Sequence, residues 1–258
     1  IKFIKNLKSE PNYNPQASKH SIMHFGVGNF HRAHQAFFVH EMLNRKKDIS
    51  IIGINLRSDK IRKSLEEQNN HYSLYECSEN KIDIHILNPY KKILFGLEDK
   101  KIICDLIANK KTKIITITVT EKGYHYNYIN KTLDLNKDIK NDLQNKKLKT
   151  LIGHLSYGLI ERYKKNKADI YILSCDNLFH NGDVLKKVVT DFVSHIDKSV
   201  ALWIEEQVKF PCTMVDCIVP NTKILPSVIK DKVQDNCLVL CEPYRDWYIG
   251  NKSNLLKN

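Results

Sequence analysis

The fold is decided by one stretch, Ser21-Ile22-Met23-His24-Phe25-Gly26-Val27-Gly28-Asn29-Phe30-His31-Arg32-Ala33-His34-Gln35. It begins as a short apolar run of strand type and turns over two glycines. It then continues with helical spacing, and this spacing places Phe30, Ala33, Phe37, Phe38 and Met42 on one face. A strand, a glycine turn and a helix form the opening of a dinucleotide-binding βαβ unit.

The two glycines have separate tasks in such a unit. Gly26 allows the tight turn, and Gly28 lets the backbone approach a pyrophosphate. The helix that opens at Phe30 then offers N–H groups and its positive dipole end to the phosphate. Arg32 could pair with that phosphate or be an exposed helix charge. Because His31 replaces the third glycine of G-x-G-x-x-G, spacing alone leaves a plain strand–turn–helix open.

The rest of the chain alternates between strand and helix patterns. Strands are expected at 22–26, 49–55, 113–119 and 168–174, and helices at 31–46, 58–69, 97–109, 151–165 and 183–195. A β-hairpin is expected over 71–77 and 81–87, and a short helix within the polar stretch 131–149. This order predicts an α/β fold with a doubly wound, Rossmann-type, mostly parallel sheet.

Proline positions suggest the domain organisation. Residues 1–18 are expected to be an N-terminal extension, because Pro11 and Pro15 disfavour a helix there. Residues 19–208 carry the alternating pattern and are assigned to the dinucleotide-binding domain. Four prolines then interrupt the remaining segment, at positions 211, 220, 226 and 243. We therefore expect 209–258 to be a linker and the beginning of a second domain.

Composition argues against several classes of protein. The net charge is +12, but the lysines are spread along the chain without interleaved aromatic residues, so a nucleic-acid interface is not expected. No run approaches the roughly 18 apolar residues of a membrane span. Residues 1–15 lack the apolar core of a secretory signal.

The seven cysteines are an odd number in a long chain, which favours free thiols in a reducing cytoplasm over a disulfide framework. No C-x-x-C pair occurs. Cys212, Cys217, Cys237 and Cys241 have spacings that are poor for a zinc site, so no metal is expected.

Five segments resemble one known family. The residues Gly-Val-Gly-x-Phe-His-Arg-Ala-His-Gln over 26–35 resemble the signature opening of the polyol-specific long-chain dehydrogenases, the mannitol dehydrogenase family. Four later segments match it in order, at 118–124, at 174–177 with Asn181-Gly182, at 210–216 and at 241–247. The resemblance implies a Rossmann domain followed by a helical C-terminal domain, of which this chain would hold only the beginning.

The family assigns an activity and several residues. It implies an NAD(P)-dependent oxidoreductase that interconverts a sugar alcohol or aldonate and its ketose or keto acid, such as mannitol/fructose or mannonate/fructuronate. It places the loop of Thr120, Glu121 and Lys122 beside the nicotinamide, Asn177 in the oxyanion site, and Asp216 against substrate hydroxyls. The full-length protein is expected to be a cytoplasmic monomer or small oligomer.

The residues alone leave other roles open for this set. Glu121 and Lys122 could be an exposed ion pair of little energetic value. Asn177 could cap the helix that follows it.

The end of the second strand bears on the choice of cofactor. A carboxylate usually stands there and binds the adenosine ribose, but this chain has Asn55, followed by Arg57. Asn55 can still bond a ribose hydroxyl, and Arg57 could accept a 2′-phosphate. The family resemblance implies NAD, and these two residues keep NADP open.

One family feature is missing from the chain. The family's general base is a lysine in a Lys-x-x-x-x-Asn-x-x-His pattern, downstream of the segment at 241–247. The nearest match, Lys122 with Asn127, has Asn130 where histidine is required. The chain is therefore expected to lack the catalytic lysine region. The alternative hypothesis is a non-catalytic nucleotide-binding module or a decayed fragment.

Overall fold

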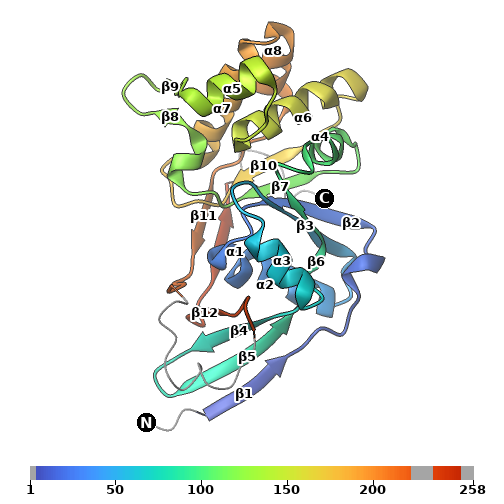
Figure 1. Ribbon diagram of the computed structural model, residues 1–258. Helices are drawn as coiled ribbons and strands as arrows, with labels where there is room; N and C mark the ends of the chain where they lie inside the picture. The colour runs from blue at the N-terminus through green and yellow to red at the C-terminus, as the bar shows by residue number, and fades with distance from the viewer. Residues whose placement is uncertain (1–3, 222–234, 251–258) are drawn as a thin grey trace.

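The computed structural model describes residues 4–221 and 235–250, and its centre is a five-stranded sheet (Figure 1). The strand order is β10-β7-β2-β3-β6, and every neighbouring pair is parallel. The strands are β2 His20–Phe25, β3 Ile49–Asn55, β6 Tyr90–Phe95, β7 Ile114–Ile117 and β10 Tyr171–Ser174. The chain order reverses between β2 and β7, which makes that gap the topological switch point. The predicted Rossmann-type sheet is confirmed, although β6 was not predicted.

Helices cover the sheet on both faces. One hydrophobic cluster joins the sheet to α4 Lys100–Ala108, α5 Lys137–Asn145, α6 Leu151–Lys165, α7 Asn181–Ser194 and α8 Lys198–Gln207. A second cluster joins it to α1 Asn29–Ala33, α2 Gln35–Asn44 and α3 Lys60–Glu67. Along β2, Met23 and Phe25 belong to the first cluster and Ile22 to the second, as strand alternation requires. No helix among the described residues is long and apolar enough to cross a membrane.

The first predicted helix is two helices. The backbone leaves the helical region at His34, with φ −112° and ψ −88°, and His34 donates from Nε2 to the Asp246 carbonyl at 2.8 Å. The break changes the phase of the helix, so the predicted face is confirmed only in part. Ala33 is buried and Phe30 and Phe37 pack against the second cluster, but Phe38 and Met42 are not part of it. The buried face of α2 instead carries Ala36, Val39, His40 and Leu43, whereas Met42 is 39% exposed.

A second sheet lies below the first in Figure 1, in the order β1-β5-β4-β12. The predicted hairpin is confirmed as β4 Tyr72–Cys77 antiparallel to β5 Lys81–Leu87. Strand β1, Ile4–Ser9, comes from the expected extension and pairs with β5. Strand β12, Val239–Cys241, comes from the expected second-domain segment and pairs with β4. Both ends of the described chain therefore add strands to this one hairpin.

The remaining elements are short. They are the 3-10 helices η1 Pro15–Ala17 and η2 Glu121–Tyr124, and the antiparallel pairs β8 Tyr126–Asn127 with β9 Thr132–Leu133, and β11 Thr213–Asp216 with β13 Asp246–Ile249. Within 209–258, the described residues form strands and no helix. The domain boundaries and the helical nature of the second domain stay predictions.

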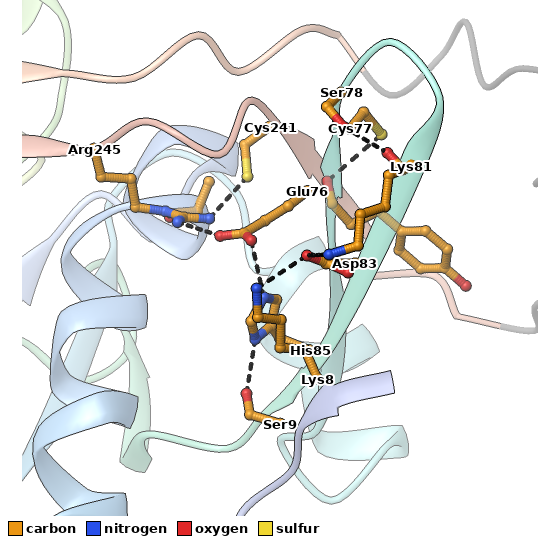
Figure 2. A network of polar contacts seen from close by, with 12 residues as sticks. Lys8, Ser9, Glu76, Cys77, Ser78, Lys81, Asp83, His85, Cys241 and Arg245 are labelled. Atoms are coloured by element: carbon orange, nitrogen blue, oxygen red, sulfur yellow. Dashed lines mark hydrogen bonds and ion pairs between the residues drawn. The ribbon is translucent and has the colours of Figure 1, made fainter. Parts of the chain in front are cut away.

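A buried ion network joins the second sheet to Arg245, in the segment between β12 and β13 (Figure 2). The Glu76 carboxylate contacts the Arg245 guanidinium and lies 3.1 Å from His85 Nε2. Burial would raise the pKa of Glu76, but the hydrogen bonds from His85 and Arg245 outweigh it and lower that pKa. Arg245 also donates to the Ala33 carbonyl at 2.6 Å. Because an unpaired buried charge is strongly destabilising, the network fixes residues 241–246 against α1.

We predict that the fold loses stability in acid through its buried histidines. Burial lowers the pKa of His24 to about 3 and that of His154 to about 4. The folded protein keeps both neutral, while the unfolded chain takes up their protons below pH 6.5. Stability is therefore complete above pH 6.5 and falls as the pH drops towards the folded pKa, by about 2 kcal/mol per histidine at pH 4.5. Urea unfolding between pH 7.5 and 4.5 measures this loss.

The variant His154→Phe keeps an aromatic ring but removes one titrating group. We expect its stability to fall less steeply with pH than that of the parent chain, by about 2 kcal/mol over the same range. Equal slopes for the two proteins would contradict the prediction.

Candidate functional site

A cavity of about 650 Å³ opens at the carboxyl ends of β2, β3 and β7, beside the switch point. Its lining comes from the turn after β2, the residues after β3, the start of α3, the loop after β7 and the segment before α6. These are Gly26, Val27, Gly28, Asn55, Leu56, Arg57, Ser58, Lys60, Ile61, Leu97, Thr118, Val119, Thr120, Gly123, His125, Asp138, Lys149, Thr150 and Leu151. This volume suits a small-molecule or cofactor site.

The two glycines of the turn shape the cavity in different ways. Gly26 has a φ of +101°, and a Cβ there would stand 2.0 Å from the Thr118 carbonyl oxygen. Its replacement is therefore excluded both by backbone conformation and by space. At Gly28 a Cβ would have no heavy atom nearer than 3.9 Å. Gly26 is thus a requirement of the fold, whereas Gly28 leaves open space beside the backbone.

The glycine turn is fastened to the neighbouring strands by side chains. The Val27 N–H donates to Asn55 Oδ1 at 3.0 Å, and the Gly26 carbonyl accepts from Thr118 Oγ1 at 2.8 Å. His24 Nε2 lies 3.1 Å from the same carbonyl. Since a carbonyl only accepts, this nitrogen carries the proton. The turn is therefore preorganised by β3 and β7 before any ligand binds.

The loop after β7 is held by one carboxylate. Asp176, two residues after the end of β10, accepts from the Val119 N–H at 3.0 Å, the Thr120 N–H at 2.9 Å and the Tyr124 hydroxyl at 2.7 Å. Burial raises the pKa of Asp176 despite these bonds. Thr120 has a φ of +70°, an unusual value for a β-branched residue. The loop's conformation is thus imposed by its contacts, a pattern common at functional sites.

The structure brings together five of the predicted site residues. Gly26, Gly28, Asn55, Arg57 and Thr120 all line the cavity, whereas Phe30, Arg32, Glu121 and Lys122 are outside its lining. Glu121 and Lys122 are exposed in η2.

Arg32 differs from both roles considered for it. The side chain is buried, and it donates to the Gly28 carbonyl at 3.3 Å, to Asn29 Oδ1 at 2.6 Å and to the Cys237 carbonyl. Its guanidinium is committed to internal acceptors, so we withdraw Arg32 as a phosphate ligand and as an exposed charge. It connects the glycine turn to the segment that leads into β12.

The two residues predicted to meet substrate lie outside the cavity lining. Asn177 is exposed beside Asp176, and the N-cap of α7 is His180, so Asn177 does not cap that helix. Asp216 is exposed at the end of β11. Asn181 belongs to a family segment but has no role assigned from the sequence, whereas in the structure its buried amide donates to the carbonyls of Ser174, Asp176 and Thr213.

Sequence reasoning also missed part of the cavity wall. Ser58, Lys60, His125, Lys149 and Thr150 line it. Burial lowers the pKa of His125, which accepts at Nδ1 from the Asn136 amide at 2.7 Å. Lys60 stands at the start of α3, within the helix that the sequence predicts after the second strand. Ser58 begins the same predicted helix, whereas His125, Lys149 and Thr150 lie outside every helix and strand of the structure.

Comparison with known proteins gives a consistent result. Residues 20–257 match the family described as the mannitol dehydrogenase Rossmann domain. The D-mannonate oxidoreductase of Escherichia coli (strain K12) is 36% identical over 251 residues, covering 93% of this chain and 52% of that protein. A mannitol 2-dehydrogenase of Aspergillus clavatus is 32% identical over 262 residues, covering 96% and 52%.

Solved structures agree with these sequence relatives. A D-sorbitol dehydrogenase in substrate-free form has a TM-score of 0.84 at 31% identity, covering 93% of this chain and 52% of that one. The Pseudomonas fluorescens mannitol 2-dehydrogenase, in ternary complex with NAD and D-mannitol, has a TM-score of 0.86 at 29% identity, covering 96% and 55%. The chain spans about half the length of the relatives it matches.

We predict that Gly28→Asp abolishes dinucleotide binding without unfolding the chain. The open space at Gly28 accommodates the side chain, but the new carboxylate would occupy and repel the pyrophosphate position. NADH affinity, measured by fluorescence titration, should fall by about 100-fold or more, which corresponds to about 2.7 kcal/mol. Gly26→Ala is the contrasting variant and should lower the melting temperature. A folded Gly28→Asp protein with parental NADH affinity would remove this turn from the binding site.

Proposed function

The chain belongs to the mannitol dehydrogenase family, and from that premise we propose that its cavity binds a nicotinamide dinucleotide. The full protein would be an oxidoreductase that interconverts a sugar alcohol or aldonate and its ketose or keto acid. The observation that carries the proposal is the open space at Gly28, inside a cavity at the switch point of a parallel sheet.

The cavity walls suit the parts of a dinucleotide. The pyrophosphate would lie over the turn of Gly26 and Gly28, where side chains are absent. The adenosine ribose would reach Asn55 at the end of β3, and the nicotinamide would lie towards Thr120 at the end of β7. This order follows the rule that dinucleotides span the carboxyl edge of such sheets across the switch point.

The bound dinucleotide would supply the hydride that passes between its nicotinamide and the substrate carbonyl carbon. The residues of this chain would position and polarise the substrate. Asn177 would donate an amide N–H to the alkoxide charge that develops on the reacting oxygen, without itself titrating. Asp216 would accept hydrogen bonds from substrate hydroxyls. The family relatives suggest two substrate pairs, mannitol with fructose and mannonate with fructuronate.

The reaction also needs a group that transfers the proton, and the 258 residues do not contain the sequence pattern in which the family carries that group. Reduction of a ketone requires an acid within hydrogen-bond reach of the reacting oxygen, and oxidation requires the corresponding base. The family uses a lysine of a Lys-x-x-x-x-Asn-x-x-His pattern, and no lysine here stands in it. We propose that this 258-residue chain binds dinucleotide but does not turn over polyols. We place the full protein in the cytoplasm as a monomer or small oligomer.

We predict NADH or NADPH binding without turnover. Loss of a general acid or base costs about 10²–10⁴ in rate, and loss of substrate positioning lowers it further. Fluorescence titration of the two reduced dinucleotides, followed by fructose and fructuronate reduction assays on the same sample, tests both halves. Measurable turnover would require a base within the chain, with Lys122 as the first candidate. Absence of all dinucleotide binding would reject the proposed function.

A further inference from the structure

We propose that the adenosine end of the cavity recognises a 2′-phosphate, so that the chain prefers NADP(H) to NAD(H). The inference rests on the proposed dinucleotide function and specifies its cofactor. Three observations carry it: the hydrogen bonding of Asn55, the charges beside Asn55, and the neutralisation of the nearest carboxylate in the chain.

Asn55 stands where NAD-specific units place the carboxylate that accepts from the ribose hydroxyls. Its side chain lines the cavity, and the residue is only 8% exposed. Oδ1 is already engaged by the Val27 N–H at 3.0 Å. Nδ2 has no hydrogen-bond partner among the described residues. The polar atom left for a ligand is therefore a donor, and a buried donor without an acceptor is costly.

An amide donor can bind a phosphate, but it cannot take over the role of the carboxylate that is missing here. A carboxylate at this position accepts from the 2′-hydroxyl and repels a 2′-phosphate. The Asn55 Nδ2 group does neither, because it carries N–H bonds and no charge. It can donate to a phosphate oxygen.

Cations lie next to Asn55 in the same wall. Arg57 and Lys60 line the cavity and are exposed, and neither forms an ion pair within the part of the chain that the structure describes. Between them, Ser58 adds a hydroxyl to the wall. An arginine can bind two phosphate oxygens at once, and lysine adds a compact charge. These residues together form a site for a dianion at the end of β3.

The acidic residue nearest to Asn55 in the sequence is Asp59, and it does not belong to this site. Asp59 lies 2.6 Å from Lys63 Nζ and 3.6 Å from Arg62 Nη2, and it is not part of the cavity lining. The only carboxylate in the described lining is Asp138, and three cations, Arg57, Lys60 and Lys149, share that lining. The field in the cavity therefore favours the dinucleotide with the larger negative charge.

The test compares NADPH with NADH by fluorescence titration, and 2′,5′-ADP with 5′-ADP by competition. We expect NADPH to bind about tenfold tighter or more, because a charge-assisted bidentate contact is added. Arg57→Gln should reduce that preference severalfold. Asn55→Asp keeps the acceptor for Val27 but replaces the free donor with an anionic oxygen, so it should shift the preference towards NADH. Lys110→Gln removes the same charge from an exposed loop outside the cavity lining and should leave the preference unchanged.

The outcomes separate the inference from the function on which it rests. Equal or tighter binding of NADH by the parent chain would overturn the 2′-phosphate site while keeping the dinucleotide function. Failure of both dinucleotides to bind would overturn both. Arg57→Gln and Lys110→Gln acting alike would show that overall charge, and not this site, sets the preference. Thermal melting confirms that each variant is folded.

Discussion

The close approach of Gly26 to the Thr118 carbonyl is the constraint on which the site depends. The turn after β2 and the loop after β7 meet there without room for even a Cβ, and the backbone adopts a positive φ. This contact lets the Thr118 hydroxyl and His24 bond the Gly26 carbonyl. The carboxyl ends of two strands separated by over 90 residues in sequence thereby form one wall. A parallel sheet with a switch point brings these ends together, and glycine lets them touch.

Two side chains fasten the glycine turn and the loop after β7 to the neighbouring strands. Asn55 links the end of β3 to the turn, and Asp176 links the end of β10 to the loop that contains Thr120. Each serves backbone N–H groups that would otherwise lie unpaired next to the cavity. The cavity is thus rigid on several sides. Rigidity of this kind lowers the entropy that a ligand loses on binding, because the walls are ordered in advance.

The second sheet gives the chain ends a structural role. β1 pairs with β5 and β12 pairs with β4, so both extend the hairpin. The ion network of Glu76, His85 and Arg245 then links this sheet to the segment after β12 (Figure 2). Arg245 belongs to the same segment that resembles the family motif at 241–247. Its buried charge has its partner on β4, and its guanidinium also bonds a carbonyl of α1. This segment therefore supports the helix that follows the glycine turn, although it lies over 200 residues away in sequence.

The sequence by itself determined four of the five strands of the central sheet, the glycine turn and the family. Local patterns sufficed for β3 and α6, whose bounds match the predicted 49–55 and 151–165, because apolar runs and helical periodicity act within one element. Only the tertiary structure decided the break at His34, the internal role of Arg32 and the free donor on Asn55. Each depends on a contact with a distant segment, namely Asp246, Cys237 and the Val27 turn. Hydrogen bonds between segments far apart in sequence leave no periodic trace, so no pattern could have predicted them.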